Sequence, residues 1–344
     1  TVNETFEAMR EGRCGIAPVT FRDVERLSIQ IGGQVRNFTP EGVFNRQQLV
    51  LYDRFTQFSL LAAKEALEQS GLVFTGELAA TSGVVLGTAG GGVSTWDDNY
   101  RAVYEEGKNR VHPFVVPKLM NNAAASHISM EYNLKGPSFT VSTACASSNH
   151  AMAQAFQLVC SGMSPAMVTG GSESMLCFGG VKAWEGLRVM SRDACRPFSA
   201  NRNGMVQGEG AAIFVFEELE HAKARKAEIL AEVVGYAMSS DAADIVMPSK
   251  QGAERAIAGA LKNAGLNPED PRLAIDWPLP VEIISEKDKN RNFLIKILIG
   301  TIPIIPVGYI LYQTGLIQQL RSLEFIGWMS LIFGIFLIML SQST

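Results

Sequence analysis

Short apolar runs alternate with amphipathic stretches along the first 270 residues of the chain. Apolar side chains at helical spacing predict helices over 48–70, 117–131, 146–162 and 251–264. Asn3 is a predicted N-cap for a short helix ending near Gly12, and Gly71 stands where a helix C-cap is expected. Continuous apolar runs predict buried strands over 82–88, 137–145, 166–171, 210–218 and 229–238. Buried strands that alternate with helices indicate a layered α/β domain.

The pattern changes after Asp270, where residues 270–290 hold three prolines and a charged cluster typical of a linker. Residues 293–312 and 325–340 are two apolar runs, and at about 1.5 Å per residue the first reaches ~30 Å. We therefore predict an apolar, transmembrane helical hairpin over 292–344, with a hairpin buried in a soluble core as the alternative. The basic residues Lys287, Lys289 and Arg291 place residue 290 on the cytoplasmic side of such a membrane.

The charge and the cysteines narrow the classes of function. A net charge of −4 leaves no basic surface, which argues against nucleic acid as a partner. The cysteines are widely spaced and show no zinc-binding pattern: Cys14, Cys145, Cys160, Cys177 and Cys195. Reduced thiols in a cytosolic enzyme are the simplest interpretation. The glycine-rich stretch GTAGGGV (87–93) lacks the spacing of a phosphate-binding loop, and we predict a tight loop at a strand end.

Cys145 is the candidate for covalent chemistry. It stands where the predicted strand 137–145 runs directly into the predicted helix 146–162. The free N–H groups and the positive dipole end of that helix would face the sulfur and favour the reactive thiolate. The small neighbours Ala144, Ala146 and Ser147 leave room for a long, thin substrate. The alternative for these few residues alone is an inert buried cysteine.

Several motifs in residues 2–270 resemble those of the β-ketoacyl-acyl-carrier-protein synthases, the condensing enzymes that share the thiolase fold. They stand in order along the chain: MREGRCGI (9–16), DRFTQFSLLAAKEAL (53–67), GPSFTVSTACAS (136–147), VTGGSES (168–174) and a long block over 196–242. Among them, VTGGSES resembles the glycine turn and acidic position of that family. The elongating type II synthases are the most similar in character, and DACRPFSANRNG and SDAADIVMPS are also similar to the rhizobial nodulation synthase.

This resemblance implies an acyltransferase of fatty acid chain elongation. Cys145 would take an acyl group from acyl-carrier protein as a thioester, and a carbanion from malonyl-carrier protein would then attack it. No cofactor is implied. The resemblance also implies a homodimer and a cytoplasmic synthase part, which would be membrane-associated if the C-terminal hairpin inserts. The implied fold is a layered α/β thiolase-like fold of two similar halves.

The sequence departs from the family where its first catalytic histidine is expected. IDWPLP (275–280) stands in place of an NAHGT-type motif, and the Lys-Ser-Met-type and Gly-Phe-Gly-Gly segments are missing. His112, His127, His150 and His221 all lie upstream and match no family histidine motif. We therefore expect an incomplete fold with its second half largely missing, a Cys145 that is acylated at best, and no condensation.

The tail carries two other resemblances. Residues 270–290 resemble the C-terminal stretch of dTDP-4-dehydrorhamnose 3,5-epimerases, and 291–340 resemble a piece of undecaprenyl-diphosphate phosphatase. We therefore expect three parts: an N-terminal synthase part over 1–270, a linker or foreign segment over 271–291, and the apolar hairpin over 292–344. The alternatives to an acyltransferase are a non-catalytic partner subunit and a membrane-anchored composite chain with no function of its own.

Overall fold

The computed structural model describes residues 1–267, which fall into two compact units. The larger unit comprises residues 15–193 and 206–228, and the smaller unit includes 1–14, 194–205 and 229–267. Within these residues no helix has the length and apolar character needed to cross a bilayer. The predicted linker over 271–291 and the predicted hairpin over 292–344 lie outside the described residues.

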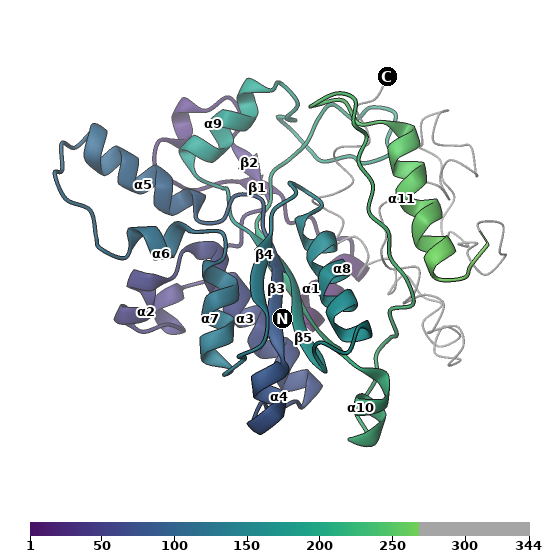
Figure 1. The fold of residues 1–344 in the computed structure, drawn as a ribbon. Helices are drawn as coiled ribbons and strands as arrows, with labels where there is room; N and C mark the ends of the chain where they lie inside the picture. The colour runs from purple at the N-terminus through teal and green to yellow at the C-terminus, as the bar shows by residue number, and fades with distance from the viewer. Residues whose placement is uncertain (268–344) are drawn as a thin grey trace. The chain divides into compact units, whose positions relative to one another are not determined.

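A four-stranded mixed sheet forms the centre of the larger unit (Figure 1). Its strands follow the spatial order β4 (Ser138–Val141), β3 (Gly83–Gly87), β5 (Ala166–Glu173) and β6 (Gly210–Glu217). The inner strand β3 pairs in parallel with both β4 and β5, and β6 pairs antiparallel with β5. The carboxyl ends of β3, β4 and β5 therefore meet at one edge of the sheet.

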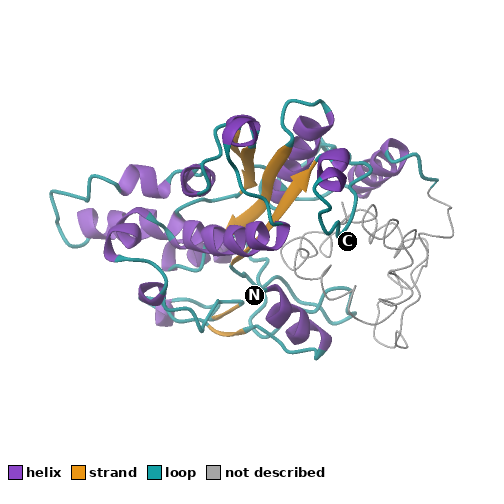
Figure 2. Ribbon diagram, turned by 90° about the horizontal axis from the view of Figure 1, so that it is seen from below, coloured by secondary structure: helices purple, strands orange, loops and turns teal. Residues whose placement is uncertain are grey.

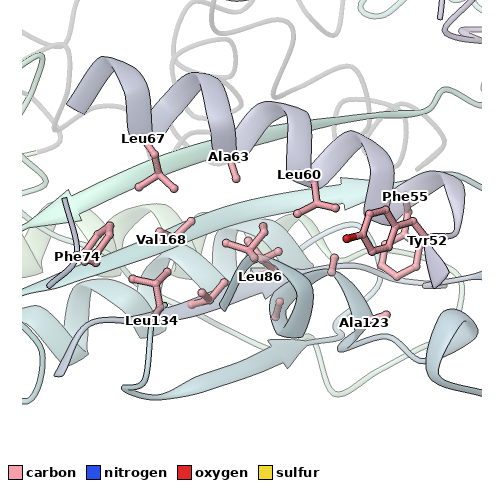
Figure 3. Close-up of a cluster of buried hydrophobic side chains, with 14 of the residues drawn as sticks. Tyr52, Phe55, Leu60, Ala63, Leu67, Phe74, Leu86, Ala123, Leu134 and Val168 are labelled. Carbon is pink, nitrogen blue, oxygen red and sulfur yellow. The ribbon is translucent and has the colours of Figure 1, made fainter. Parts of the chain in front are cut away.

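Helices cover both faces of this sheet (Figure 2). Successive strand side chains point to opposite faces. Val84 and Leu86 join a cluster formed with α3 (Arg54–Ser70) and α7 (Ala123–Glu131), as Figure 3 shows around Leu86. Val85, between them in sequence, packs against α8 (Ser147–Cys160) on the other face. The larger unit is thus a three-layer α/β/α arrangement, which confirms the layered α/β domain that the sequence predicted.

The remaining elements of the larger unit surround these layers. Two short strands, β1 (Ala17–Pro18) and β2 (Ile31–Gly32), form a separate antiparallel pair. The other elements are η1 (Val24–Arg26), η2 (Pro40–Gly42), α2 (Arg46–Leu51), α4 (Gly76–Thr81), α5 (Val93–Tyr104), α6 (Val115–Leu119), α9 (Phe178–Gly186) and α10 (Leu219–Ala224).

The local sequence explains the limits of α3. The Asp53 carboxylate accepts a hydrogen bond from the backbone N–H of Phe55 at 3.2 Å and caps the helix N-terminus. Gly71 ends the helix with a left-handed φ of 64°, which confirms the predicted C-cap. The predicted helix over 48–70 is divided in the structure, because Tyr52 has an extended backbone between α2 and α3.

Most predicted strands of the larger unit are confirmed, with one change. Residues 82–88, 166–171 and 210–218 correspond to β3, β5 and β6. The strand predicted over 137–145 ends earlier, at Val141, and lies at the sheet edge with its first residues exposed rather than buried. The residues that follow Val141 leave the pairing with β3 and form the turn that carries Cys145.

The smaller unit contains two helices, α1 (Val2–Arg10) and α11 (Lys250–Asn263). Thr1, rather than Asn3, caps α1 through a capping box with Glu4. The strand predicted over 229–238 is wrong, because these residues form no strand in the structure. They run beside α11 instead, where the backbone N–H of Tyr236 donates to the Asn263 side chain at 3.1 Å. An apolar run forms a strand only where a neighbouring strand pairs with it.

Candidate active site

The turn between β4 and α8 presents Cys145. Ala144, directly before it, has a left-handed backbone with a φ of 51°. This conformation costs an alanine about 1–2 kcal/mol, and such strain concentrates at functional sites. Cys145 is partly buried, and Ala146 after it is the N-cap of α8. The predicted strand-to-helix transition at the cysteine is confirmed in outline, with the five residues 142–146 forming a turn between β4 and α8.

The Ser147 side chain holds this turn closed. Its hydroxyl accepts a hydrogen bond from the backbone N–H of Thr143 at 2.8 Å and donates one to the carbonyl of Ala144 at 2.6 Å. Ser147 is only 3% exposed, so water does not replace these bonds. The hydroxyl thus fixes the backbone on both sides of the left-handed residue.

Two glycines let α8 lie directly on the carboxyl ends of the strands. A Cβ atom at Gly87, the last residue of β3, would lie 2.2 Å from the backbone carbonyl carbon of Ser147 and 2.3 Å from the nitrogen of Ser148. A Cβ atom at Gly171 in β5 would lie 2.8 Å from the Cβ of Ser148. Real Cβ atoms do not approach other atoms so closely. The first turn of α8 is therefore placed by the absence of side chains at these two positions.

Two opposing influences act on the Cys145 thiol. α8 begins directly beside Cys145, and its positive dipole end favours the thiolate, although the backbone N–H of Ser147 is already bonded to the Ala144 carbonyl at 3.1 Å. Burial, however, raises the pKa of Cys145, the Glu173 charge raises it further, and a hydrogen bond from the cysteine's own backbone lowers it. The pKa of Cys145 is raised overall, so the resting group at neutral pH is the thiol rather than the thiolate.

Glu173, the last residue of β5, binds the glycine-rich loop that follows β3. One carboxylate oxygen accepts from the backbone N–H of Ala89 at 2.7 Å. The other accepts from the backbone N–H of Gly90 and from the Thr88 hydroxyl, both at 3.3 Å. Burial raises the pKa of Glu173 against these bonds. The tight loop predicted at this strand end is confirmed, whereas the contact of Glu173 with it was not predicted.

The rings of His127 and His150 are partly buried among neighbouring side chains. The ring of His127 packs edge-on against Tyr52 with 4.5 Å between ring centroids, and burial lowers its pKa. His150 lies within α8, and burial lowers its pKa as well. Both rings are therefore biased toward the neutral form. The influences that determine the pKa of Cys145 include no histidine among residues 1–267.

His112 and His221 have other local partners. The Nδ1 atom of exposed His112 accepts from the backbone N–H of Phe114 at 3.2 Å. His221 Nδ1 lies 2.5 Å from a carboxylate oxygen of Glu217, which also binds Arg225. In the part of the chain that the structure describes, no group of three or more His, Cys, Asp or Glu side chains could hold a metal ion.

Comparison with solved structures identifies the fold of this chain as a thiolase-like ketosynthase fold. The solved structure of a β-ketoacyl synthase from Burkholderia phymatum STM815 matches with a TM-score of 0.71 and 28% identity, over 78% of this chain and 67% of that chain. The ishigamide ketosynthase/chain length factor matches with a TM-score of 0.72 and 29% identity over the same shares.

Sequence relatives give the family. The model of the β-ketoacyl synthase N-terminal domain matches residues 1–222. Nodulation protein E of Rhizobium leguminosarum bv. trifolii is 43% identical over 77% of this chain, and 3-oxoacyl-[acyl-carrier-protein] synthase 2 of Staphylococcus aureus (strain N315) is 36% identical over 78%. This chain belongs to the β-ketoacyl synthase family of condensing enzymes. It spans 66% and 67% of the lengths of these two relatives.

The same comparisons bear on the tail. The matched relatives give no support to the epimerase resemblance of residues 270–290 or to the phosphatase resemblance of residues 291–340. Both segments lie wholly beyond the family match, which ends at residue 222, and outside the described residues.

Proposed function

We propose that this chain accepts an acyl group on Cys145 from an acyl-carrier protein, as the first half of a 3-oxoacyl-acyl-carrier-protein synthase reaction. The observation that carries the proposal is the position of Cys145 on a strained turn, at the N-terminus of a helix that two glycines hold against the strand ends. This turn is held from both sides by Ser147, so the sulfur has a defined direction of approach.

The chemistry of this step needs no cofactor. The thiol loses its proton, the sulfur attacks the carbonyl carbon of the acyl thioester, and a tetrahedral intermediate forms. The bond between that carbon and the carrier's sulfur then breaks, and the carrier leaves as a free thiol with a proton. The positive dipole end of α8 would stabilise the negative charge that develops near Cys145.

The second half-reaction, in which malonyl-carrier protein loses carbon dioxide and attacks the acyl group, needs groups that this sequence lacks. None of the four histidines matches the family's histidine motifs. We therefore expect acylation without chain elongation by the chain as it stands. The expected partner is acyl-carrier protein, as in the related complex of a type II ketosynthase with its acyl-carrier protein. From the family resemblance we also expect a homodimer in the cytoplasm.

Intact mass spectrometry tests the proposal. The purified full chain is incubated with a long-chain acyl-carrier protein, and we expect a gain of one acyl mass. Cys145→Ala abolishes this gain, whereas Cys160→Ala, at an exposed cysteine, retains it. A chain that gains nothing, or that gains the same mass in Cys145→Ala, contradicts the proposal. Chain elongation that depends on Cys145 after malonyl-carrier protein is added contradicts the expected loss of condensation.

A second candidate is a non-catalytic partner subunit, which the structural similarity to a ketosynthase/chain length factor favours. Cys145 argues against it, because a subunit without catalysis has no need of a nucleophile at this turn. Binding of acyl-carrier protein without any transfer of the acyl group to the chain would support this candidate.

A further inference from the structure

The loop that follows β3 connects Glu173 to the turn over residues 142–146 that carries Cys145, here termed the nucleophile turn. Ala89 is bonded on both sides: its N–H donates to Glu173 at 2.7 Å, and its carbonyl accepts from the Ser142 hydroxyl at 3.3 Å. Ser142 is the first residue after β4 and stands three positions before Cys145. A displacement of Glu173 would therefore reach the turn through a single intervening residue.

Further bonds make this loop a stiff connector. The backbone N–H of Thr88 donates to the carbonyl of Val141, the last residue of β4, at 3.2 Å. The Thr88 hydroxyl accepts from the backbone N–H of Gly91 at 3.2 Å while it donates to Glu173. The loop is thus bonded to the end of β4 on one side and to the end of β5 on the other.

The hydrogen-bond pattern requires a carboxylate at residue 173. Each of its two oxygens accepts from a backbone N–H, one from Ala89 and the other from Gly90. A glutamine side chain has one acceptor oxygen and one NH₂ group, so one of these N–H donors would face another donor. An aspartate keeps both oxygens but is shorter by one methylene group. Glutamate is therefore the side chain whose length and acceptor pattern both fit the loop.

We propose that Glu173 is a positioning residue, whose carboxylate holds the loop 88–91 against the nucleophile turn and thereby controls the reactivity of Cys145. The expected effect of Glu173 on acylation rests on the proposed function, whereas its expected effect on the alkylation of Cys145 does not. Glu173 acts through Ala89 and Ser142 on the position of the turn, and through its charge on the proton of the Cys145 thiol.

These two effects have opposite signs. Holding the turn favours acyl transfer, because a small misplacement of a reacting group slows a reaction strongly. The negative charge raises the pKa of Cys145 and so keeps the thiol protonated. The strands β3 and β4 carry no titratable side chain. On α8, His150 is near the start of the helix and burial lowers its pKa, whereas Cys160 is at the far end. On β6, Glu217 pairs with Ala166 at the end of β5 opposite to Glu173.

The test measures alkylation of Cys145 by iodoacetamide in the full chain, followed by peptide mass spectrometry across a range of pH. In Glu173→Gln the charge is removed, so we expect the alkylation midpoint to move to lower pH by about 0.5–1 unit. In Glu173→Asp the charge remains and the midpoint stays near that of the wild type. In both variants we expect acylation by acyl-carrier protein to fall about 10- to 100-fold, because the loop loses its support.

Glu220→Gln is the matched control, since Glu220 is exposed in α10 and pairs with Lys223 at the surface. It should change neither the midpoint nor the acylation rate. Ser142→Ala, which removes the other bond to Ala89 without touching Glu173, should slow acylation and leave the midpoint unchanged. This variant keeps the inference testable if both changes at Glu173 prevent folding.

The outcomes separate the two proposals. Wild-type acylation rates in Glu173→Gln, Glu173→Asp and Ser142→Ala overturn the positioning role, and an unshifted midpoint in Glu173→Gln overturns the role of the charge. If the wild-type chain is alkylated at Cys145 but never acylated by the carrier protein, the proposed function fails. A shifted midpoint in Glu173→Gln would then still support the control of Cys145 by Glu173.

Discussion

The two faces of the central sheet are packed with side chains of very different size. On one face, α3 and α7 bury large groups such as Phe55, Leu60 and Ile128 against the strands. On the other face, the buried residues of α8 are small, including Ala151 and Ala155, and its first turn rests on glycines. Large side chains give stability through buried area, whereas small ones let the backbone of α8 approach the strand ends. The first face stabilises the unit, and the second positions the turn that carries Cys145.

The largest expected effect is on the first face. Phe55 is fully buried, so Phe55→Ala leaves a cavity and should lower the free energy of unfolding by about 3–5 kcal/mol. Urea unfolding followed by circular dichroism measures this change. Under conditions where the variant remains folded, Cys145 should still be acylated, because Phe55 lies outside the nucleophile turn. A loss below about 1 kcal/mol would show that this face is not tightly packed.

Gly87→Ala tests the second face. The backbone of Gly87 suits any residue, but the new Cβ would overlap the backbone of Ser147 and Ser148 and push α8 away from β3. We expect a loss of about 1–3 kcal/mol in stability and a fall of about 100-fold in the acylation rate. Gly186→Ala is the control, because no atom lies within 4 Å of the added Cβ at that helix end. An acylation rate in Gly87→Ala equal to that of the control would contradict the placement of α8.

Ser147→Ala should have a smaller effect on stability, about 1–2 kcal/mol, because it leaves the N–H of Thr143 without its partner. The turn around Ala144 would lose both hydrogen bonds of the Ser147 hydroxyl. We therefore expect slower acylation of Cys145, with an unchanged fold by circular dichroism. Ser161→Ala, at the exposed end of α8, removes a serine hydroxyl bond of the same kind to Leu158. Equal acylation rates in the two variants would exclude a clamping role for Ser147.

The smallest effect is expected on the solvent side of α3. Lys64 and Glu68 are exposed and separated by 3.9 Å, so Lys64→Ala should change stability by less than about 0.5 kcal/mol. Thermal unfolding at low and high salt provides the measurement. A change in the free energy of unfolding above about 1 kcal/mol would show that the exposed side of α3 also stabilises the fold, as its buried side does.

Sequence patterns predicted the elements of the first face well. The apolar spacing of α3, its glycine C-cap and the strands β3 and β5 all depend on residues close together in the chain. The helices α5 and α9 were not predicted. In α5 the aromatic residues Trp96, Tyr100 and Tyr104 share one face at a spacing of four, but that face is exposed to solvent. The buried residues of α5 are the polar Thr95 and Arg101, so hydrophobicity does not indicate its buried side.

The strand predicted over 229–238 was wrong for a different reason. Its apolar residues satisfy the pattern of a buried strand, and the run lacks only a partner. Its backbone instead lies beside α11, where Gly235 leaves room for Ala264. Hydrophobicity is a property of one segment, whereas a strand forms only when a second segment pairs with it.

The amino-acid sequence by itself determined where the apolar runs lie, which residue could act as nucleophile, and that Cys145 stands between a strand and a helix. These properties follow from the order of side chains along a short stretch of chain. Only the tertiary structure decided that Ala144 takes a left-handed backbone and that Glu173 supports the loop 88–91. The Glu173 contact joins the ends of β5 and β3, which are distant in sequence, so it exists only after those strands have paired. The backbone of Ala144 is held by the Ser147 hydroxyl, at the start of a helix that rests on Gly87 of β3.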